Sequence, residues 1–235
     1  MNELSKRQSL ILEKIIREYI RLAQPISSDF LEKKYQFGLC SATIRNEMQS
    51  LTEKGFLFQS HPSSGRIPTD KGYRFFVNFI LELGIKDWRE KIKDLLETNF
   101  ENETKFIQQL TKRLAEATET LTLSYQIKEK IVWKEGWEEI LKEPEFEEKK
   151  CVLKFLDFIE DVEKKIEDLE IDSDIKIFIG RENPFRQASD FSLITSKCCL
   201  PDGDNMILSL LGPKRMSYEK NISLIRSLTK ILEDY

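Results

Sequence analysis

One stretch, from Cys40 to Phe76, constrains the fold of this chain more than any other. Its first part predicts a helix from Ser41 to Lys54, because Ser41 can accept hydrogen bonds from free backbone amides and Gly55 can end the helix in a left-handed conformation. One face of this helix is apolar at the i, i+4, i+7 spacing, so we expect it to pack inward. That face carries Ile44, Met48 and Leu51.

The opposite face of the same helix is polar. Guanidinium, amide and hydroxyl groups are the side-chain groups that hydrogen-bond base edges and phosphate oxygens. Arg45 and Asn46 are therefore expected to read bases, with assistance from Thr43 and Gln49, and Ser41 is expected to meet a phosphate. This interpretation makes the helix a recognition helix for double-stranded DNA.

A hairpin is predicted directly after this helix. Residues 56–58 lead out along one strand, residues 67–69 return along the other, and His61 to Arg66 form the tip. Small residues at a tip let the backbone approach a phosphate, so Ser63 and Ser64 are candidate phosphate contacts and Arg66 can reach a phosphate or a narrow minor groove. A solvated loop would have the same pattern, and the position beside the polar helix favours DNA.

Two shorter helical patterns precede the polar helix. The first runs from Leu4 to Leu22 with Ser5 as its cap, and Pro25 stops it. The second starts at Ser27 or Ser28 and ends near Gly38. Three helices with short turns, a hairpin and a closing helix form the order of elements of a winged helix-turn-helix.

The charge of the chain is unevenly distributed. Residues 1–80 hold 12 Lys and Arg against 8 Asp and Glu, whereas the remaining residues hold 25 against 33, within a formal net charge of -4. This balance argues against a chain that coats nucleic acid all over and focuses anion affinity on its first part. Chance unevenness is the alternative explanation.

Other classes of function find little support. No run of about 18 apolar residues and no signal peptide is visible, which predicts a cytoplasmic protein without a membrane partner. The four cysteines show no metal-binding spacing, so we expect no metal, no cofactor and no disulfide framework. The one histidine, His61, lies at the hairpin tip without a nearby nucleophile, so the chain is not expected to be an enzyme.

The first part of the chain resembles a known family. The runs LSKRQSLILEKIIREYI, SATIRNEM and HPSSGRIPTDKGYRFFVNFI are similar to the N-terminal region of the HrcA family, bacterial heat-inducible transcription repressors. The resemblance implies a recognition helix at Ser41 and a wing at His61–Arg66. It also implies a dimer that binds an inverted-repeat operator, represses heat-shock chaperone operons and depends on the GroE chaperonin.

A long helical pattern follows, from Asp87 to about Ser124. Apolar residues recur in it with alternating steps of three and four, which predicts either a short dimerisation seam or a helix packed on its own domain. The residues of this candidate seam are Ile107, Leu110, Leu114 and Leu121.

The last part predicts an α+β domain, since strands at residues 131–133, 175–180, 191–197 and 205–212 alternate with helices. GWEEILKEPEF, IGRENPF, SLITSK and LGPKRMSYEKNISLI resemble the GAF-like domain of the same family, shortened here by roughly a hundred residues where the family carries its dimerisation insert. Residues 181–183 and 214–216 are candidate ligand contacts or structural turns. The expected domains are a winged helix over 1–84, a linker helix over 85–125 and a truncated GAF-like domain over 126–235.

Two functions from different classes remain open. The first is a dimeric DNA-binding repressor. The second is a ligand-sensing or protein-interaction module with a vestigial winged helix. Preference for an inverted-repeat duplex over a scrambled one separates them.

Overall fold

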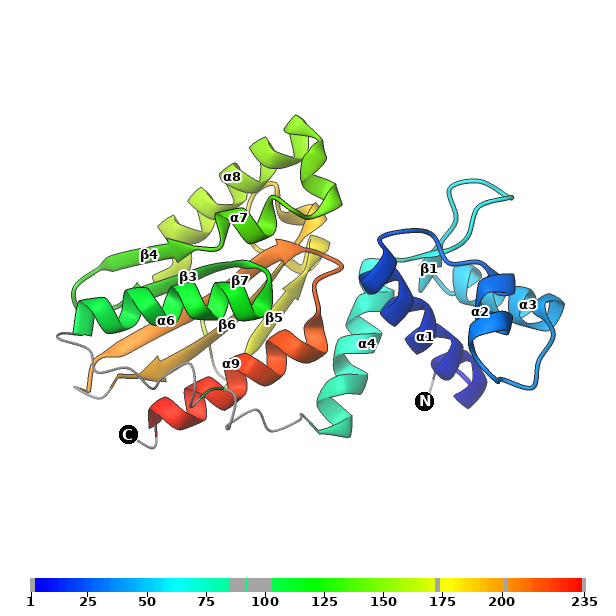
Figure 1. The fold of residues 1–235 in the computed structure, drawn as a ribbon, viewed down its shortest axis with the longest axis horizontal. Coiled ribbons are helices and arrows are strands. Elements are labelled where there is room, and N and C mark those ends of the chain that lie inside the picture. Colours follow the sequence, from blue (N-terminus) through cyan, green and yellow to red (C-terminus); the bar gives the residue numbers. More distant parts are fainter. Residues whose placement is uncertain (1–2, 85–91, 93–102, 172–173, 201–202, 234–235) are drawn as a thin grey trace. The chain divides into compact units, whose positions relative to one another are not determined.

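A computed structural model describes residues 3–84, 92, 103–171, 174–200 and 203–233 (Figure 1). The chain divides into two compact units, Met1–Leu83 and Gly84–Tyr235. Each unit has its own core and is described by itself.

The first unit contains three helices, a two-stranded hairpin and a closing helix, as the sequence predicts. Its strands pair antiparallel, with Leu57 opposite Pro68 and Phe58 opposite Ile67. The elements are α1 (Lys6–Leu22), α2 (Ser28–Lys34), α3 (Ser41–Glu53), β1 (Leu57–Phe58), β2 (Ile67–Pro68) and α4 (Asp70–Leu83).

Side-chain caps fix where the helices of the first unit begin. Ser5 and Gln8 form a reciprocal capping box at the start of α1, and the Ser27 hydroxyl accepts a hydrogen bond from the Phe30 amide at the start of α2. The predicted cap at Ser41 is wrong. Cys40 is the capping position of α3 and makes no side-chain cap bond, while Gly55 is left-handed as predicted, with φ of 78°.

A buried carboxylate joins α1 to the end of α2. Glu18 of α1 accepts hydrogen bonds from Tyr35 and forms ion pairs with Lys34 at 2.5 Å and Arg21 at 2.8 Å. Its side chain is only 5% exposed. Buried charge is tolerated where it is paired, so this network fixes the position of α2 on α1.

The second unit is built on a five-stranded antiparallel sheet with the order β4-β3-β7-β6-β5. Helices cover both faces: α6 and α9 lie on one, and α7 and α8 lie on the other (Figure 1). The strands are β3 (Leu121–Gln126), β4 (Ile131–Glu135), β5 (Lys176–Ile179), β6 (Phe191–Cys199) and β7 (Asn205–Pro213). The α-helices are α6 (Glu103–Thr118), α7 (Trp137–Ile140), α8 (Lys149–Lys165) and α9 (Tyr218–Glu233), and the short 3-10 helices are η1 (Pro144–Glu147), η2 (Ile166–Asp168), η3 (Gly180–Glu182) and η4 (Ala188–Asp190).

The predicted long helix is corrected at its end. It stops at Thr118, Glu119 takes a left-handed φ of 55°, and the chain continues as β3. The first part of that predicted helix lies largely outside the described residues. Within the described residues, α6 packs on the sheet of the second unit and β3 is one of its strands, so residues 103–126 belong to that unit. The predicted linker boundary at residue 85 lies outside the described residues.

The candidate dimerisation seam is also corrected. Ile107, Leu110 and Leu114 are at most 1% exposed, on a helix that contacts β3, β4 and α9 of its own unit. Leu121 is not on the helix at all, and it packs with the core on the α8 side of the sheet. Since these side chains fill the core of one copy, they are unavailable to a second copy.

The core on the α8 side is rich in aromatic rings. Phe191 lies at its centre, with ring centroids 4.9 Å from Phe155, 5.6 Å from Phe158 and 6.1 Å from Phe146. The first residue of β6 therefore holds α8 and η1 against the sheet. Ring contacts of this kind, two stacked and one tilted, add stability beyond the buried area.

Candidate nucleic-acid interface

The outer face of α3 presents the polar side chains that the sequence singled out. Arg45, Asn46 and Gln49 are exposed, whereas Ile44, Met48 and Leu51 of the same helix are buried. Thr43 is half-buried, and its hydroxyl lies 3.3 Å from the Cys40 thiol. The 3.6-residue period of the helix thus separates a core face from a polar face.

Hydrogen bonds from the Ser41 hydroxyl connect the start of α3 to the start of α2. Ser41, the first residue of α3, donates to Ser28 at 2.9 Å and to the carboxylate of Asp29. Its hydroxyl is therefore engaged with the start of α2 and orients α3. The sequence places Ser41 on the DNA side, and that role stays a prediction.

The hairpin tip is organised by its own hydrogen bonds. Gln59 donates to the backbone oxygens of Pro62 at 3.0 Å and Ser64 at 2.8 Å, and Ser64 donates to the oxygen of His61 at 2.8 Å. Ser63 is exposed. Of the two predicted phosphate contacts, Ser63 faces solvent, whereas the hydroxyl of Ser64 is used within the turn.

A third backbone segment supports the hairpin, and sequence reasoning missed it. The amide of Ile26 donates to the oxygen of Arg66 at 2.9 Å, and the amide of Arg66 donates to the oxygen of Ile26 at 2.8 Å. A single bridging residue between two helices leaves no periodic pattern, so only the apolar Ile26 beside Pro25 could have signalled it. The bridge ties the hairpin to the α1–α2 turn.

The sequence predicts that the Arg66 side chain reaches toward a phosphate or a minor groove, but the structure buries it. It is 7% exposed, and its guanidinium donates to the Thr52 hydroxyl and the Gln49 amide oxygen, both at 3.1 Å. Burial lowers the pKa of Arg66, and the neighbouring charge of Arg45 lowers it further. Arg66 therefore joins the hairpin to α3 and positions Gln49 rather than extending into solvent.

Replacing Gly65 by alanine tests this support. A Cβ at Gly65 would lie 2.6 Å from backbone atoms of Pro25 and Ile26, so the hairpin has to move away from its bridge. We expect a loss of about 1–3 kcal/mol in the free energy of unfolding and weaker binding to every duplex. Thermal unfolding and fluorescence anisotropy measure the two effects.

The matched control is Ser63→Ala, two residues away in the same hairpin tip and at an exposed position. It should leave the unfolding transition unchanged and remove at most one phosphate contact. Unaltered stability and affinity in the Gly65→Ala variant would show that the close approach at Ile26 does not position the hairpin.

The candidate ligand contacts of the second unit are structural turns. Asn183 donates to the backbone oxygens of Gly180 at 2.9 Å and Phe191 at 3.1 Å, and Glu182 accepts from the Ile179 amide at 3.1 Å. Arg215 forms ion pairs with Glu145 at 2.6 Å and with Glu143. These polar groups hold loops against the sheet.

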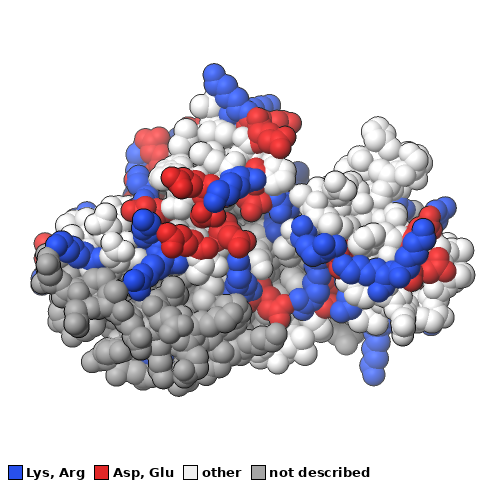
Figure 2. Space-filling model, viewed as in Figure 1, with Lys and Arg blue, Asp and Glu red and all other residues white. Residues whose placement is uncertain are grey.

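One unit presents an exposed polar helix beside a hairpin, a combination that is typical of DNA-binding domains, and the other is an α+β domain. Figure 2 shows Lys and Arg side chains gathered on the visible face of the first unit. The family described as HrcA protein C terminal domain matches residues 71–222. The chain belongs to the HrcA family.

Several relatives carry the name heat-inducible transcription repressor HrcA. The one from Thermodesulfovibrio yellowstonii is 26% identical over 343 positions, which cover 98% of this chain and 99% of the relative. Because this chain has 235 residues, at least 108 of these positions are gaps in it. The relative from Thermoanaerobacter sp. (strain X514) is 56% identical over 78 residues, 33% of this chain and 23% of its own.

A solved structure supports the fold. A crystal structure of a hypothetical protein is 21% identical, has a TM-score of 0.81, and is matched over 99% of this chain and 98% of its own. Within the described ranges, no helix has both the length and the apolar character needed to cross a bilayer. Over the same residues, no group of three His, Cys, Asp or Glu side chains is placed to hold a metal ion.

Proposed function

We propose that the chain is a transcription repressor whose first unit is a winged helix-turn-helix that binds an inverted-repeat operator as a dimer. The second unit is, in this proposal, a shortened GAF-like domain. The observation that carries the proposal is the outer face of α3, where Arg45, Asn46 and Gln49 are exposed together beside the hairpin. The names of the relatives, heat-inducible transcription repressor HrcA, support the repressor class. Heat-shock chaperone operons are the targets that the family resemblance adds.

The residues divide into two roles. Arg45 and Asn46 read base edges, because a guanidinium and an amide each form two hydrogen bonds to a purine in the major groove. Thr43 and Gln49 assist them, and Gln49 is held in place by Arg66. Ser63 meets a phosphate through its exposed hydroxyl. Ser41 and Ser64 are the other proposed phosphate contacts, and to make them their hydroxyls exchange the hydrogen bonds that they form to Ser28 and His61. The GroE chaperonin is the partner that the family resemblance adds.

Replacing Arg45 by alanine should weaken binding to the operator by about 1–3 kcal/mol, because a specific base contact is lost. Fluorescence anisotropy at fixed salt, on an inverted-repeat duplex and on its scrambled counterpart, measures the difference. Arg45→Lys keeps the positive charge but cannot form the bidentate hydrogen bonds of a guanidinium. It should therefore retain non-specific binding and lose the preference for the inverted-repeat duplex over the scrambled one.

The matched control is Arg186→Ala, which removes an exposed arginine from the second unit. It should leave both affinities unchanged. Equal binding of wild-type protein to both duplexes would instead favour the ligand-sensing or protein-interaction module. Unchanged operator preference in the Arg45→Ala variant would show that α3 is not the recognition helix.

A further inference from the structure

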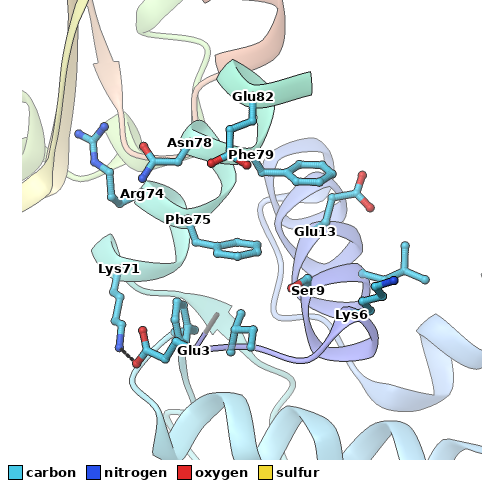
Figure 3. A pocket seen from close by; sticks show the side chains of 13 residues that line it. Glu3, Lys6, Ser9, Glu13, Lys71, Arg74, Phe75, Asn78, Phe79 and Glu82 are labelled. Carbon is cyan, nitrogen blue, oxygen red and sulfur yellow. Dashed lines mark hydrogen bonds and ion pairs between the residues drawn. The ribbon is translucent and has the colours of Figure 1, made fainter. Parts of the chain in front are cut away.

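The first unit carries a cavity of about 770 Å³ between α1 and α4 (Figure 3). Its apolar lining includes Leu10, which is 46% exposed, and the rings of Phe56, Phe75 and Phe79. Figure 3 shows Phe75 and Phe79 pointing from α4 into the space between the two helices. Among the lining residues of this cavity, none belongs to α3.

α4 has a second apolar edge in addition to its buried one. The side chains that pack into the first unit are Tyr73, Phe76, Val77 and Ile80. Phe75 and Phe79 lie one turn apart outside this set, half-buried, with stacked rings 6.5 Å apart. We call this stacked pair of rings the Phe75–Phe79 ladder. Together with the exposed Leu10 of α1, it forms an apolar surface that a further apolar element can cover.

The other edge of the same face of α4 is polar and has a charge gradient. Arg74 and Asn78 lie beside the two rings, about 100° around the helix from them, and Glu82 follows one turn after Asn78 (Figure 3). Arg74 and Glu82 are eight residues apart, about 12 Å along the axis, too far to pair within one helix. The face is therefore basic toward its start, acidic toward its end and amide-bearing in the middle.

We propose that this face of α4 docks against α4 of a second copy, antiparallel and centred on Asn78. A two-fold axis through Asn78 and perpendicular to the helices places Arg74 of each copy opposite Glu82 of the other. The same operation sets the Phe75–Phe79 ladder against its own copy on the aromatic edge. An amide at the centre of a helix pair fixes its register, as a buried Asn does in coiled coils.

Self-complementarity selects a second copy over other occupants. Under the two-fold axis, the aromatic edge of one copy contacts the aromatic edge of the other, and Arg74 of each copy lies opposite Glu82 of the other. An isologous interface requires a surface that is complementary to itself in this way. The partner's rings fill the cavity beside α1. The contact uses no residue of α3, so both α3 helices keep their polar faces free. The inference deepens the proposed function, since an inverted repeat needs two copies.

Sedimentation equilibrium of the full chain without DNA tests the interface. The wild-type chain should be a dimer, and Phe79→Glu should raise the dimer dissociation constant by roughly ten-fold or more, since it places a charge in an apolar contact. The control Leu153→Glu changes an apolar side chain on α8 that is 52% exposed, more than Phe79, and should leave the constant unchanged.

A charge exchange makes the test independent of folding defects. Arg74→Glu and Glu82→Arg should each weaken the dimer, because each creates like charges across the axis. The double variant should restore it, since both cross-axis pairs are re-formed with reversed sign. Circular dichroism confirms that each variant is folded.

The outcomes separate this inference from the proposed function. A monomeric wild-type chain, an unaffected dimer in Phe79→Glu, or no restoration in the double variant would overturn the interface. A dimer with the expected responses supports it, even if the wild-type protein shows no operator preference, in which case the proposed function fails and the interface stands. Arg45→Ala should leave the dimer intact, because α3 lies outside the contact.

Discussion

Replacing Phe191 by alanine is expected to lower the free energy of unfolding of the second unit by about 3–5 kcal/mol. The side chain is fully buried and touches three other rings, from α8 and η1. Removing it leaves a cavity at the junction of the sheet with these helices, which rigid neighbouring rings cannot fill. The loss therefore includes both the transfer of the ring and the cavity that remains.

Urea unfolding followed by tryptophan fluorescence measures this loss, since Trp137 packs against the same core. Leu153→Ala is the control, because this leucine on α8 is 52% exposed and should change stability by no more than about 0.5 kcal/mol. Phe191→Leu should cost less than alanine, since it keeps most of the volume. Equal stability of the Phe191→Ala and Leu153→Ala variants would show that the ring cluster does not hold the unit together.

Replacing Glu18 by glutamine is expected to destabilise the first unit by up to about 3 kcal/mol at neutral pH. Burial by itself raises the pKa of Glu18, but hydrogen bonds from Lys34, Tyr35 and Arg21 outweigh it and lower the pKa from 4.5 to about 2. Burial and the hydrogen bond to Glu18 also raise the pKa of Tyr35 to about 12. The folded chain thus favours the carboxylate form, which glutamine cannot supply.

The direction of the pH dependence follows from the lowered pKa. The unfolded chain binds a proton at Glu18 more readily than the folded chain, so the contribution is complete above pH 4.5 and is lost as the pH falls toward about 2. Urea unfolding followed by circular dichroism should therefore show a difference between wild type and Glu18→Gln that shrinks in acid.

The control for this prediction is Glu160→Gln on α8. That carboxylate pairs with Lys164 at the surface, with both side chains 65% exposed. Solvent screens such a pair, so no measurable change is expected. A constant difference between wild type and Glu18→Gln across the acid range would contradict the assigned role of Glu18.

Much of the fold is readable in the sequence because local signals agree with the final structure. Helix caps, Gly55 and the apolar period define the elements of the first unit within a few residues. In the second unit, the strands around residues 176–179, 191–199 and 205–213 are confirmed. Runs of β-branched and apolar residues between turns carry that information without reference to distant parts of the chain.

The errors share a physical cause. Leu121 continues the apolar spacing of the preceding helix, yet it lies in β3, which pairs with β4 on one side and with β7 on the other. The partners in β7 are 80 to 90 residues away in the sequence, and this pairing overrides the helical pattern. The bridge from Ile26 and the burial of Arg66 likewise depend on partners that are distant in sequence. A one-dimensional pattern does not contain these contacts.

The sequence by itself determined which side chains are available on α3, because the helical period alone separates Arg45, Asn46 and Gln49 from the buried face. Tertiary structure decided what holds them in place, since Arg66 folds back onto Gln49 and Ser41 turns to Ser28. Tertiary structure also buries Ile107, Leu110 and Leu114 in the core of the second unit, so they cannot form a dimer surface. The face of α4 that carries Phe75 and Phe79 is the surface that we propose instead. Periodicity is a property of one helix, whereas burial is settled by what packs against it.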